Sequence, residues 1–367
     1  MIIESKELGS RIAGARRDLG LTQQECALRA QMGRTALAKI ETGARRVGAL
    51  ELAMLADALE MRIEWFFEDA PPAVVSRRSA AETGVPSPEI DRYVERVARE
   101  VTFLASIVDS LDLPATPELQ VPTKMADAER AAIEVRGLLG YGDGEPALQL
   151  ADRAARIGLL AFSLDLDADT ADGASILLDR GGVAVVNGTR DLGRRRLTLA
   201  HELGHYVFAD EYSTDWNVAE TSATRTEARI DRFARALLLP ESALRLGWSG
   251  RGDTRTRAIL IGSRFRVDMS TLANRLTELQ LASLDEVTEV RTSIIRRADL
   301  VEHDLFVPTE LDPPELPNPY VKAVLDAYRG EEISAARALS LLLETWNQGD
   351  LPELPMLPAE AIWSFVS

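Results

Sequence analysis

Apolar residues recur at helical spacing along most of this 367-residue chain, in runs that glycine, proline and polar residues interrupt. Between Lys6 and Glu68 the pattern predicts five short helices, with breaks at Gly20, at 31–33, at 42–47 and around Glu60. Helices this short cannot bury much surface singly. We therefore expect a compact helical module at the N-terminus.

A proline-rich stretch at 70–88 is typical of a linker. From 89 to 111, apolar residues then alternate in steps of four and three over about three heptads, which predicts a helix that pairs with another helix. The partner helix could lie in a second subunit or in the same chain. A homodimer joined by this helix is the first of these alternatives.

The middle of the chain combines helices with short strands. Glycines 181 and 182 supply a hairpin turn between two of the strands. We predict helices at 126–139, 146–157, 195–208 and 224–239, and strands at 161–166, 174–178 and 183–186. Residues beyond Gly250 are again mostly helical. The fold class expected is therefore α+β, mostly α.

The sharpest chemical signal is His201-Glu202-Leu203-Gly204-His205, an HExxH motif within an apolar helical run. Histidines four residues apart lie on one helix face, where both can bind one zinc ion while the Glu acts on a water molecule. Two histidines on a solvent-exposed helix face are the alternative, which the apolar character of this run disfavours. The sequence predicts one Zn²⁺ per chain, held by His201 and His205, with Glu202 as the catalytic base.

Zinc needs a third protein ligand, and the following helix offers Glu227. This residue shares the apolar side of its helix with Ile230, where a carboxylate without a cation would be costly. Competing ligands are Glu220, Asp210 and Glu211. The last two would require the chain to turn back directly after the motif helix.

Asp231, one turn after Glu227, is placed to accept the free ring N–H of a ligand histidine and fix its tautomer. Ordinary pairing with nearby arginines is the alternative for both carboxylates. The sequence leaves the oxyanion-stabilising residue open, and the candidates are Tyr206, Tyr212 and His303.

Composition narrows the function further. The single cysteine, Cys26, excludes a thiolate metal cluster within one chain, so metal ligands must be His, Asp or Glu. No apolar run approaches a membrane span, and we expect a cytoplasmic protein without a membrane partner. The net charge of −16 argues against a protein that coats nucleic acid over its whole surface, but a local basic patch could still bind DNA.

Such a patch lies in the N-terminal module, where Lys6 to Leu50 hold nine Lys or Arg against four Asp or Glu. The segment 21–43 resembles the XRE/Cro-like helix-turn-helix family, with Thr22 and Glu25 forming a capping box and Gln31 to Gly33 the turn. Gln31 stands where the family often has Gly, and Gly33 where Ser is common. The resemblance implies that the module binds an operator in double-stranded DNA; a protein-binding module is the alternative.

In such modules the start of the second helix meets base edges and the flanks contact phosphates. The residues expected at base edges are Arg34, Thr35 and Ala38. Those expected at phosphates are Gln23, Lys39, Arg45 and Arg46.

The run from Arg194 to Ala200 into HELGH, followed by a helix ending FARALLLP, resembles the ImmA/IrrE family of bacterial and phage metallopeptidases over roughly 126–277. The family's second helix commonly reads ExEANxFA, and here it reads EARIDRFA, with Arg229 in place of the second Glu. The resemblance implies a zincin-like zinc peptidase that cleaves a repressor or another regulatory protein.

Four segments follow from these patterns. We expect a helix-turn-helix domain at 1–69, a linker with the heptad helix at 70–123, a metallopeptidase domain at 124–250 and a helical region at 251–367. The predicted function is a DNA-binding regulator fused to a zinc endopeptidase that cleaves a repressor- or antitoxin-type protein during a stress or mobile-element response. The alternative is a transcription factor whose peptidase-like domain senses or scaffolds without turnover.

Overall fold

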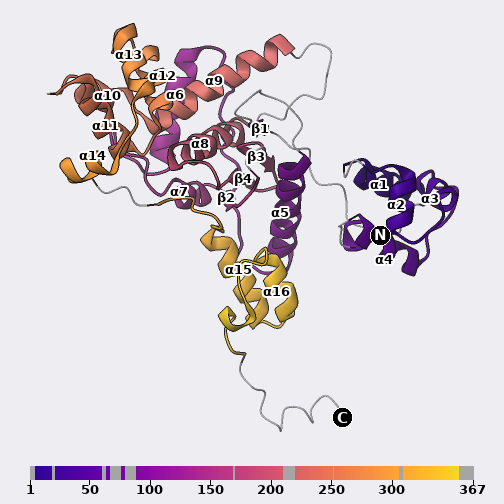
Figure 1. Cartoon of the computed structure of the whole chain (residues 1–367). Helices are drawn as coiled ribbons and strands as arrows, with labels where there is room; N and C mark the ends of the chain where they lie inside the picture. Colours follow the sequence, from indigo (N-terminus) through magenta and orange to yellow (C-terminus); the bar gives the residue numbers. More distant parts are fainter. Residues whose placement is uncertain are drawn as a thin grey trace. The chain divides into compact units, whose positions relative to one another are not determined.

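The chain forms two compact units, residues 1–71 and 72–367, seen in the computed structural model of Figure 1. The structure describes residues 5–18, 21–59, 63–66, 76–78, 88–167, 170–209, 220–250, 252–305 and 309–354. We call the two parts the N-terminal unit and the C-terminal unit and describe each by itself.

In its described residues the N-terminal unit has four α-helices and a 3₁₀ turn, in agreement with the five segments predicted from the sequence. They are α1 (Ser5–Asp18), α2 (Gln23–Arg29), α3 (Arg34–Glu41), α4 (Ala49–Ala58) and η1 (Ile63–Phe66). Their apolar faces meet in one core, which includes the fully buried Ile12, Leu37 and Leu55. The unit therefore has a hydrophobic core of its own, which is the property expected of a separate domain.

A four-stranded mixed sheet lies in the C-terminal unit, in the order β1-β3-β4-β2. The strands are β1 (Ser76–Arg78), β2 (Leu159–Leu164), β3 (Gly173–Leu177) and β4 (Gly182–Asn187). β3 and β4 form the predicted hairpin around Gly181, whose φ of +73° suits glycine. β2 pairs parallel to β4, and β1 pairs antiparallel to β3. Strand β1 was not predicted, because it lies in the stretch that its prolines mark as a linker.

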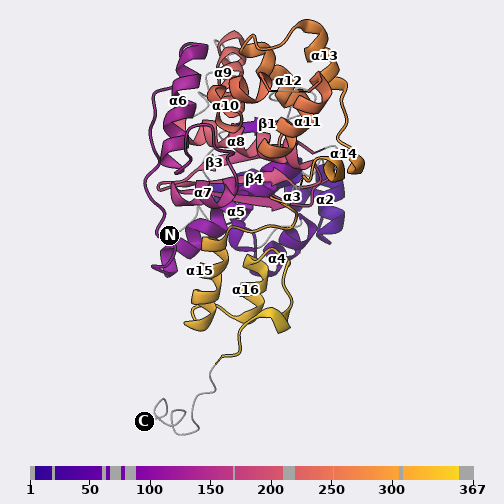
Figure 2. The same ribbon diagram turned by 90° about the vertical axis from the view of Figure 1, so that its left-hand side faces the viewer.

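Strands β2, β3 and β4 are buried on both faces, which explains why these three strands are almost wholly apolar. Ala184 and Val186 of β4 join a core shared with α8 (Leu192–Phe208), whereas Val183 and Val185 join a second core shared with α5 (Pro88–Ile107). Figure 2 shows α8 on one side of the sheet and α5 on the other. The unit therefore has three layers, with the motif helix packed directly on the sheet.

The heptad stripe of α5 is buried within its own chain. Val94, Val97, Val101 and Leu104 are at most 1% exposed and pack in the second core with β3, β4 and α15 (Asn318–Arg329). Of the two partners that the heptads allowed, the structure has the one in the same chain. The prediction that this stripe joins two subunits is wrong, because its apolar face is already covered.

Most of the remaining helices pack in the core that α8 shares with the sheet, and the last of them packs with α15 in the second core. The fold class, α+β and mostly α, is as predicted. The helices are α6 (Met125–Leu138), α7 (Leu150–Arg156), α9 (Glu220–Leu238), α10 (Glu241–Trp248), α11 (Thr254–Phe265), α12 (Met269–Glu278), α13 (Leu284–Thr292), α14 (Arg297–Glu302) and α16 (Ala335–Leu341), with a 3₁₀ turn η2 (Gln348–Asp350). None of the helices in the described ranges is long and apolar enough to cross a membrane.

The region after residue 250 shares its packing with the preceding part. The fully buried Arg196 of α8 forms an ion pair with Glu310, and the carboxylate of Glu310 also binds Arg266. Ser163 exchanges two backbone hydrogen bonds with Glu315 at the outer edge of β2, each 2.9 Å long. Residues near 310 thus complete both the surroundings of the motif helix and one edge of the sheet.

Candidate metal centre and nucleic-acid interface

Helix α8 carries the motif on its most buried part. His201, Glu202 and His205 are at most 3% exposed, so the two imidazoles are not on a solvated face. Their Nε2 atoms lie 3.2 Å apart, as expected for histidines one turn apart that point to a common centre. The solvent-exposed alternative for this motif is therefore wrong.

Helix α9 crosses α8 and brings Glu227 to the two histidines. The Oε2 atom of Glu227 lies 3.2 Å from His201 Nε2, and its Oε1 atom lies 3.4 Å from His205 Nε2. One donor atom from each residue lies within 4.8 Å of the other two. The three side chains form a group that could hold a metal ion.

The carboxyl group of Glu227 is ionised in these surroundings. Burial raises its pKa, but hydrogen bonds from His201 and His205 outweigh that effect and hold the pKa well below the ordinary 4.5. The site thus combines two imidazoles with one carboxylate in a mostly buried position.

Asp231 contacts His201 on the side of the imidazole ring that faces away from Glu227. Its Oδ1 atom lies 3.0 Å from His201 Nδ1, so the ring nitrogen that faces away from Glu227 has an acceptor. Arg235, one turn further along α9, lies 3.6 Å from the other Asp231 oxygen and also binds Glu278 of α12. Asp231 therefore stands where a residue that orients a ligand would stand.

Glu202 points from α8 toward β3. Ser175 Oγ donates a hydrogen bond of 2.7 Å to its Oε2 atom, and a Cβ atom on Gly173 would lie 3.5 Å from its Oε1 atom. The Oε1 atom is buried and has no hydrogen-bond partner within the described ranges. One oxygen of this carboxylate is thus anchored, and the other is left for a donor such as water. Sequence reasoning missed Ser175, which sits 27 residues before Glu202 with no motif around it.

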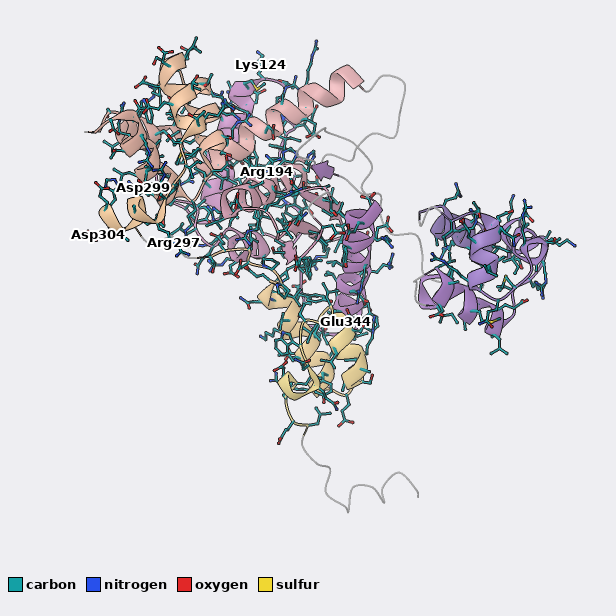
Figure 3. All side chains as sticks on the ribbon, viewed as in Figure 1. Lys124, Arg194, Arg297, Asp299, Asp304 and Glu344 are labelled. Carbon is teal, nitrogen blue, oxygen red and sulfur yellow. The ribbon has the colours of Figure 1, made fainter. Side chains whose placement is uncertain are left out.

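Arg194, labelled in Figure 3, lies two turns before Glu202 on α8 and pairs with Asp172, the residue that precedes β3. The buried Asp172 carboxylate also binds Arg190 at 2.8 Å. These ion pairs fix the start of β3 against the start of α8. They therefore hold the strand beside Glu202 in place.

The other sequence candidates lie elsewhere. Glu220 begins α9, about 10 Å along the helix axis from Glu227, and its side chain is outside the described residues. Tyr206 donates its hydroxyl hydrogen to the Ile157 carbonyl at 2.7 Å, and burial raises its pKa to about 12, so its role is structural. His303 follows α14 and does not belong to the metal-ligand group. The remaining three candidates, Asp210, Glu211 and Tyr212, lie outside the described residues.

In the N-terminal unit, α2 and α3 have the predicted ends. Thr22 Oγ1 accepts a hydrogen bond from the Glu25 N–H at 3.2 Å, and Glu25 accepts one from the Thr22 N–H at 2.8 Å, so the capping box is present. Gly33 is the N-cap of α3. Gln31 has a φ of 51°, a left-handed conformation that usually favours glycine, which explains why glycine is common at this turn position.

Most residues predicted to contact DNA are exposed. Five of the side chains are exposed, and Ala38 of α3 is half-buried. The exposed ones are Arg34, Thr35, Lys39, Arg45 and Arg46. Arg45 binds Glu51 at 2.7 Å, so a phosphate contact from Arg45 would compete with this ion pair.

Gln23 has an internal partner as well. Its Nε2 atom donates to Glu41 at 2.7 Å, and Arg16 donates to the same carboxylate at 2.6 Å. Glu41 thus ties α1 and α2 to α3, a link between distant residues that no local pattern signals. A phosphate contact by Gln23 would therefore compete with its hydrogen bond to Glu41.

Two family models match the chain. Residues 154–277 match the peptidase family model described as the IrrE N-terminal-like domain, and residues 12–66 match the model described as helix-turn-helix. The chain joins these two domains. The HELGH motif, Glu227 and Asp231 all lie within the IrrE N-terminal-like domain, and the helices expected to meet DNA lie within the helix-turn-helix domain. Searches of curated proteins and of solved structures give no match.

The IrrE N-terminal-like domain fits a zinc ion by its donor chemistry. Two imidazole nitrogens and a carboxylate are a donor set that catalytic zinc sites use, with a further position left open. Glu202 lies on α8 one residue after His201 and three residues before His205. A metallopeptidase-like domain with an intact His-His-Glu group is therefore joined to a DNA-binding domain.

Gly204, inside HELGH, allows α9 to approach α8 closely. A Cβ atom there would lie 2.9 Å from Ile230 and 3.0 Å from Phe233, which is too close for either side chain. We expect Gly204→Ala to lower the free energy of unfolding by about 1–3 kcal/mol and to reduce zinc content, because α9 carries Glu227. Urea unfolding and metal analysis measure both effects. Gly137→Ala is the control, because a Cβ atom there would meet no described atom within 4 Å apart from the neighbouring backbone of its own helix, so stability should not fall.

A second prediction concerns the helix-turn-helix domain. Arg34→Ala should weaken binding to a duplex selected from a random pool by about 1–3 kcal/mol if Arg34 binds a guanine, with little effect on unrelated DNA. Arg46→Ala should weaken binding to both and reduce the salt slope by about one. Fluorescence anisotropy over a salt series measures both. Equal losses on both duplexes for Arg34→Ala would assign that residue to phosphate.

Proposed function

We propose that this chain is a DNA-binding transcriptional regulator with a zinc-dependent endopeptidase that cleaves a repressor- or antitoxin-type protein in a stress or mobile-element response. The observation that carries the proposal is the mostly buried group of His201, His205 and Glu227 beside Glu202. The Oε2 atom of Glu202 binds Ser175, and its Oε1 atom has no hydrogen-bond partner among the described residues. A domain kept only as a scaffold would not need that carboxylate beside three ligand side chains.

Each side chain has a defined part in the proposed reaction. His201, His205 and Glu227 would hold a zinc ion, which when bound would act as a Lewis acid and lower the pKa of a water molecule. Glu202 accepts a proton at Oε1 and passes it to the leaving amine. Ser175 keeps Glu202 oriented by its hydrogen bond, and Asp231 fixes the tautomer of His201.

The helix-turn-helix domain supplies the second half of the proposal. Its predicted partner is an operator in double-stranded DNA, which in this proposal restricts the peptidase to the neighbourhood of the genes it regulates. Modules of this type normally occupy two half-sites, so the proposal includes a homodimer, held by a surface other than the buried stripe of α5. A regulator of this kind acts in the cytoplasm.

One experiment separates this function from a non-catalytic sensor. The chain and its Glu202→Gln form are each co-expressed with the regulators encoded beside its gene, and each purified chain is analysed for zinc. We expect one zinc ion per chain in both forms and a cleaved regulator only with the wild type. Zinc without cleavage of any regulator would instead support the sensing or scaffold role.

A further inference from the structure

The outer edge of β3 lies beside the proposed catalytic base. Gly173 and Ser175 are the β3 residues closest to Glu202: Ser175 binds its Oε2 atom, and a Cβ atom on Gly173 would lie 3.5 Å from its Oε1 atom. An extended peptide that added a strand here would pass Glu202 along its length. We call the outer edge of β3, residues 173–177, the substrate edge.

The chain itself occupies this edge. Strand β1, residues 76–78, pairs antiparallel with β3, and Ser76 lies opposite Ser175 while Arg78 lies opposite Gly173. The paired stretch of β3 therefore begins and ends with the two residues nearest Glu202. β1 also contacts α8, the helix that carries the HELGH motif.

β1 lies at the start of the C-terminal unit, five residues after the boundary at residue 71. It is three residues long, and nine residues separate it from α5. A strand this short gains little stability by itself, so it competes mainly through its tether, which keeps it at a high effective concentration. A second peptide cannot pair with the same backbone groups of β3 at the same time.

We infer that the substrate edge is a binding surface for an extended peptide and that β1 occupies it as an internal peptide ligand, which a protein substrate must displace. This inference rests on the proposed function, because it takes Glu202 to be the catalytic base. The recognition is by main-chain pairing, which accepts many sequences. The segment that joins the DNA-binding domain to the peptidase domain thereby controls access to the site.

The test uses a fluorescein-labelled peptide with the sequence of residues 72–84 and the full, zinc-loaded chain carrying Glu202→Gln, so that binding is measured without turnover. In one variant Ser76→Gly, Arg77→Pro and Arg78→Gly prevent strand pairing. In the matched control Ser76→Thr, Arg77→Val and Arg78→Thr remove the same two charges but favour a strand.

The strand-breaking variant should bind the labelled peptide at least about tenfold more tightly than the chain with native β1 or the control, as measured by anisotropy. Bound peptide should slow amide exchange in residues 173–177 of the strand-breaking variant. Equal affinity for all three proteins, or protection elsewhere, would overturn the inference.

The same variants with Glu202 restored separate this inference from the proposed function. If the strand-breaking variant binds the peptide tightly and also hydrolyses it, both stand. If the variant binds the peptide tightly but hydrolyses neither this peptide nor any regulator encoded beside the gene, the substrate edge binds peptides as inferred. The proposed peptidase activity is then contradicted. If a regulator is hydrolysed at the same rate with native β1 and with the strand-breaking variant, a substrate does not have to displace β1. The proposed peptidase activity is then still supported.

Discussion

Glu202→Gln should reduce cleavage of the regulatory substrate by about 100- to 10,000-fold while leaving zinc content and fold unchanged. The three ligand side chains do not include Glu202, so the metal keeps its donors. The amide oxygen of Gln can still accept the hydrogen bond of Ser175, but the amide cannot take up a proton. Cleavage rates, metal analysis and unfolding curves on the same preparations measure all three properties.

Glu241→Gln is the matched control for that variant. Glu241 lies on α10 in a surface pair with Arg245, so the same chemical change there should leave cleavage at the wild-type rate. If Glu202→Gln cleaved as fast as Glu241→Gln, another group would have to accept the proton, and the proposed base would be excluded.

Glu227→Ala should lower zinc affinity by more than about 100-fold, a larger loss than removal of a residue outside the ligand set would give. The substitution leaves two protein ligands, fewer than catalytic zinc sites use. It also removes the carboxylate that both histidines contact at 3.2 and 3.4 Å. Competition with a chelator of known affinity measures the change.

Two further variants bracket this result. Asp231→Ala should lower zinc affinity or activity by about 10- to 100-fold, because Asp231 contacts His201 and does not belong to the ligand group. Glu220→Ala should change neither. Full zinc occupancy of Glu227→Ala under chelator competition would contradict the ligand set, and the third donor would then have to be sought at Glu220, Asp210 or Glu211.

The group that could hold a metal ion was predictable from the sequence because its geometry is local. The spacing of His201 and His205 fixes their shared helix face, and the apolar neighbours of Glu227 mark the side of α9 that is buried. What the sequence could not give was the crossing of the two helices. That crossing depends on the contact between Gly204 and residues of α9 such as Ile230.

Features that depend on long-range pairing escaped prediction. Ser175 reaches Glu202, and β1 reaches β3, across segments with no shared pattern. The heptads of α5 fixed a helix and its apolar face but not the partner, because a sheet and α15 cover that face as well as a second helix would. Periodicity predicts which side of a helix or strand is buried, but the element that packs against that side is known only from the fold.

Because Arg196 forms a buried ion pair with Glu310, the two domains can be completed only at different times during synthesis. The core of the N-terminal unit is complete at Phe66, whereas the motif helix gains this partner only when residue 310 has been added, about 240 residues later. At typical rates of synthesis that interval is roughly 12–50 s, and domains generally fold in the order in which they emerge. A nascent chain therefore carries a folded DNA-binding domain well before its metal-binding domain can be complete.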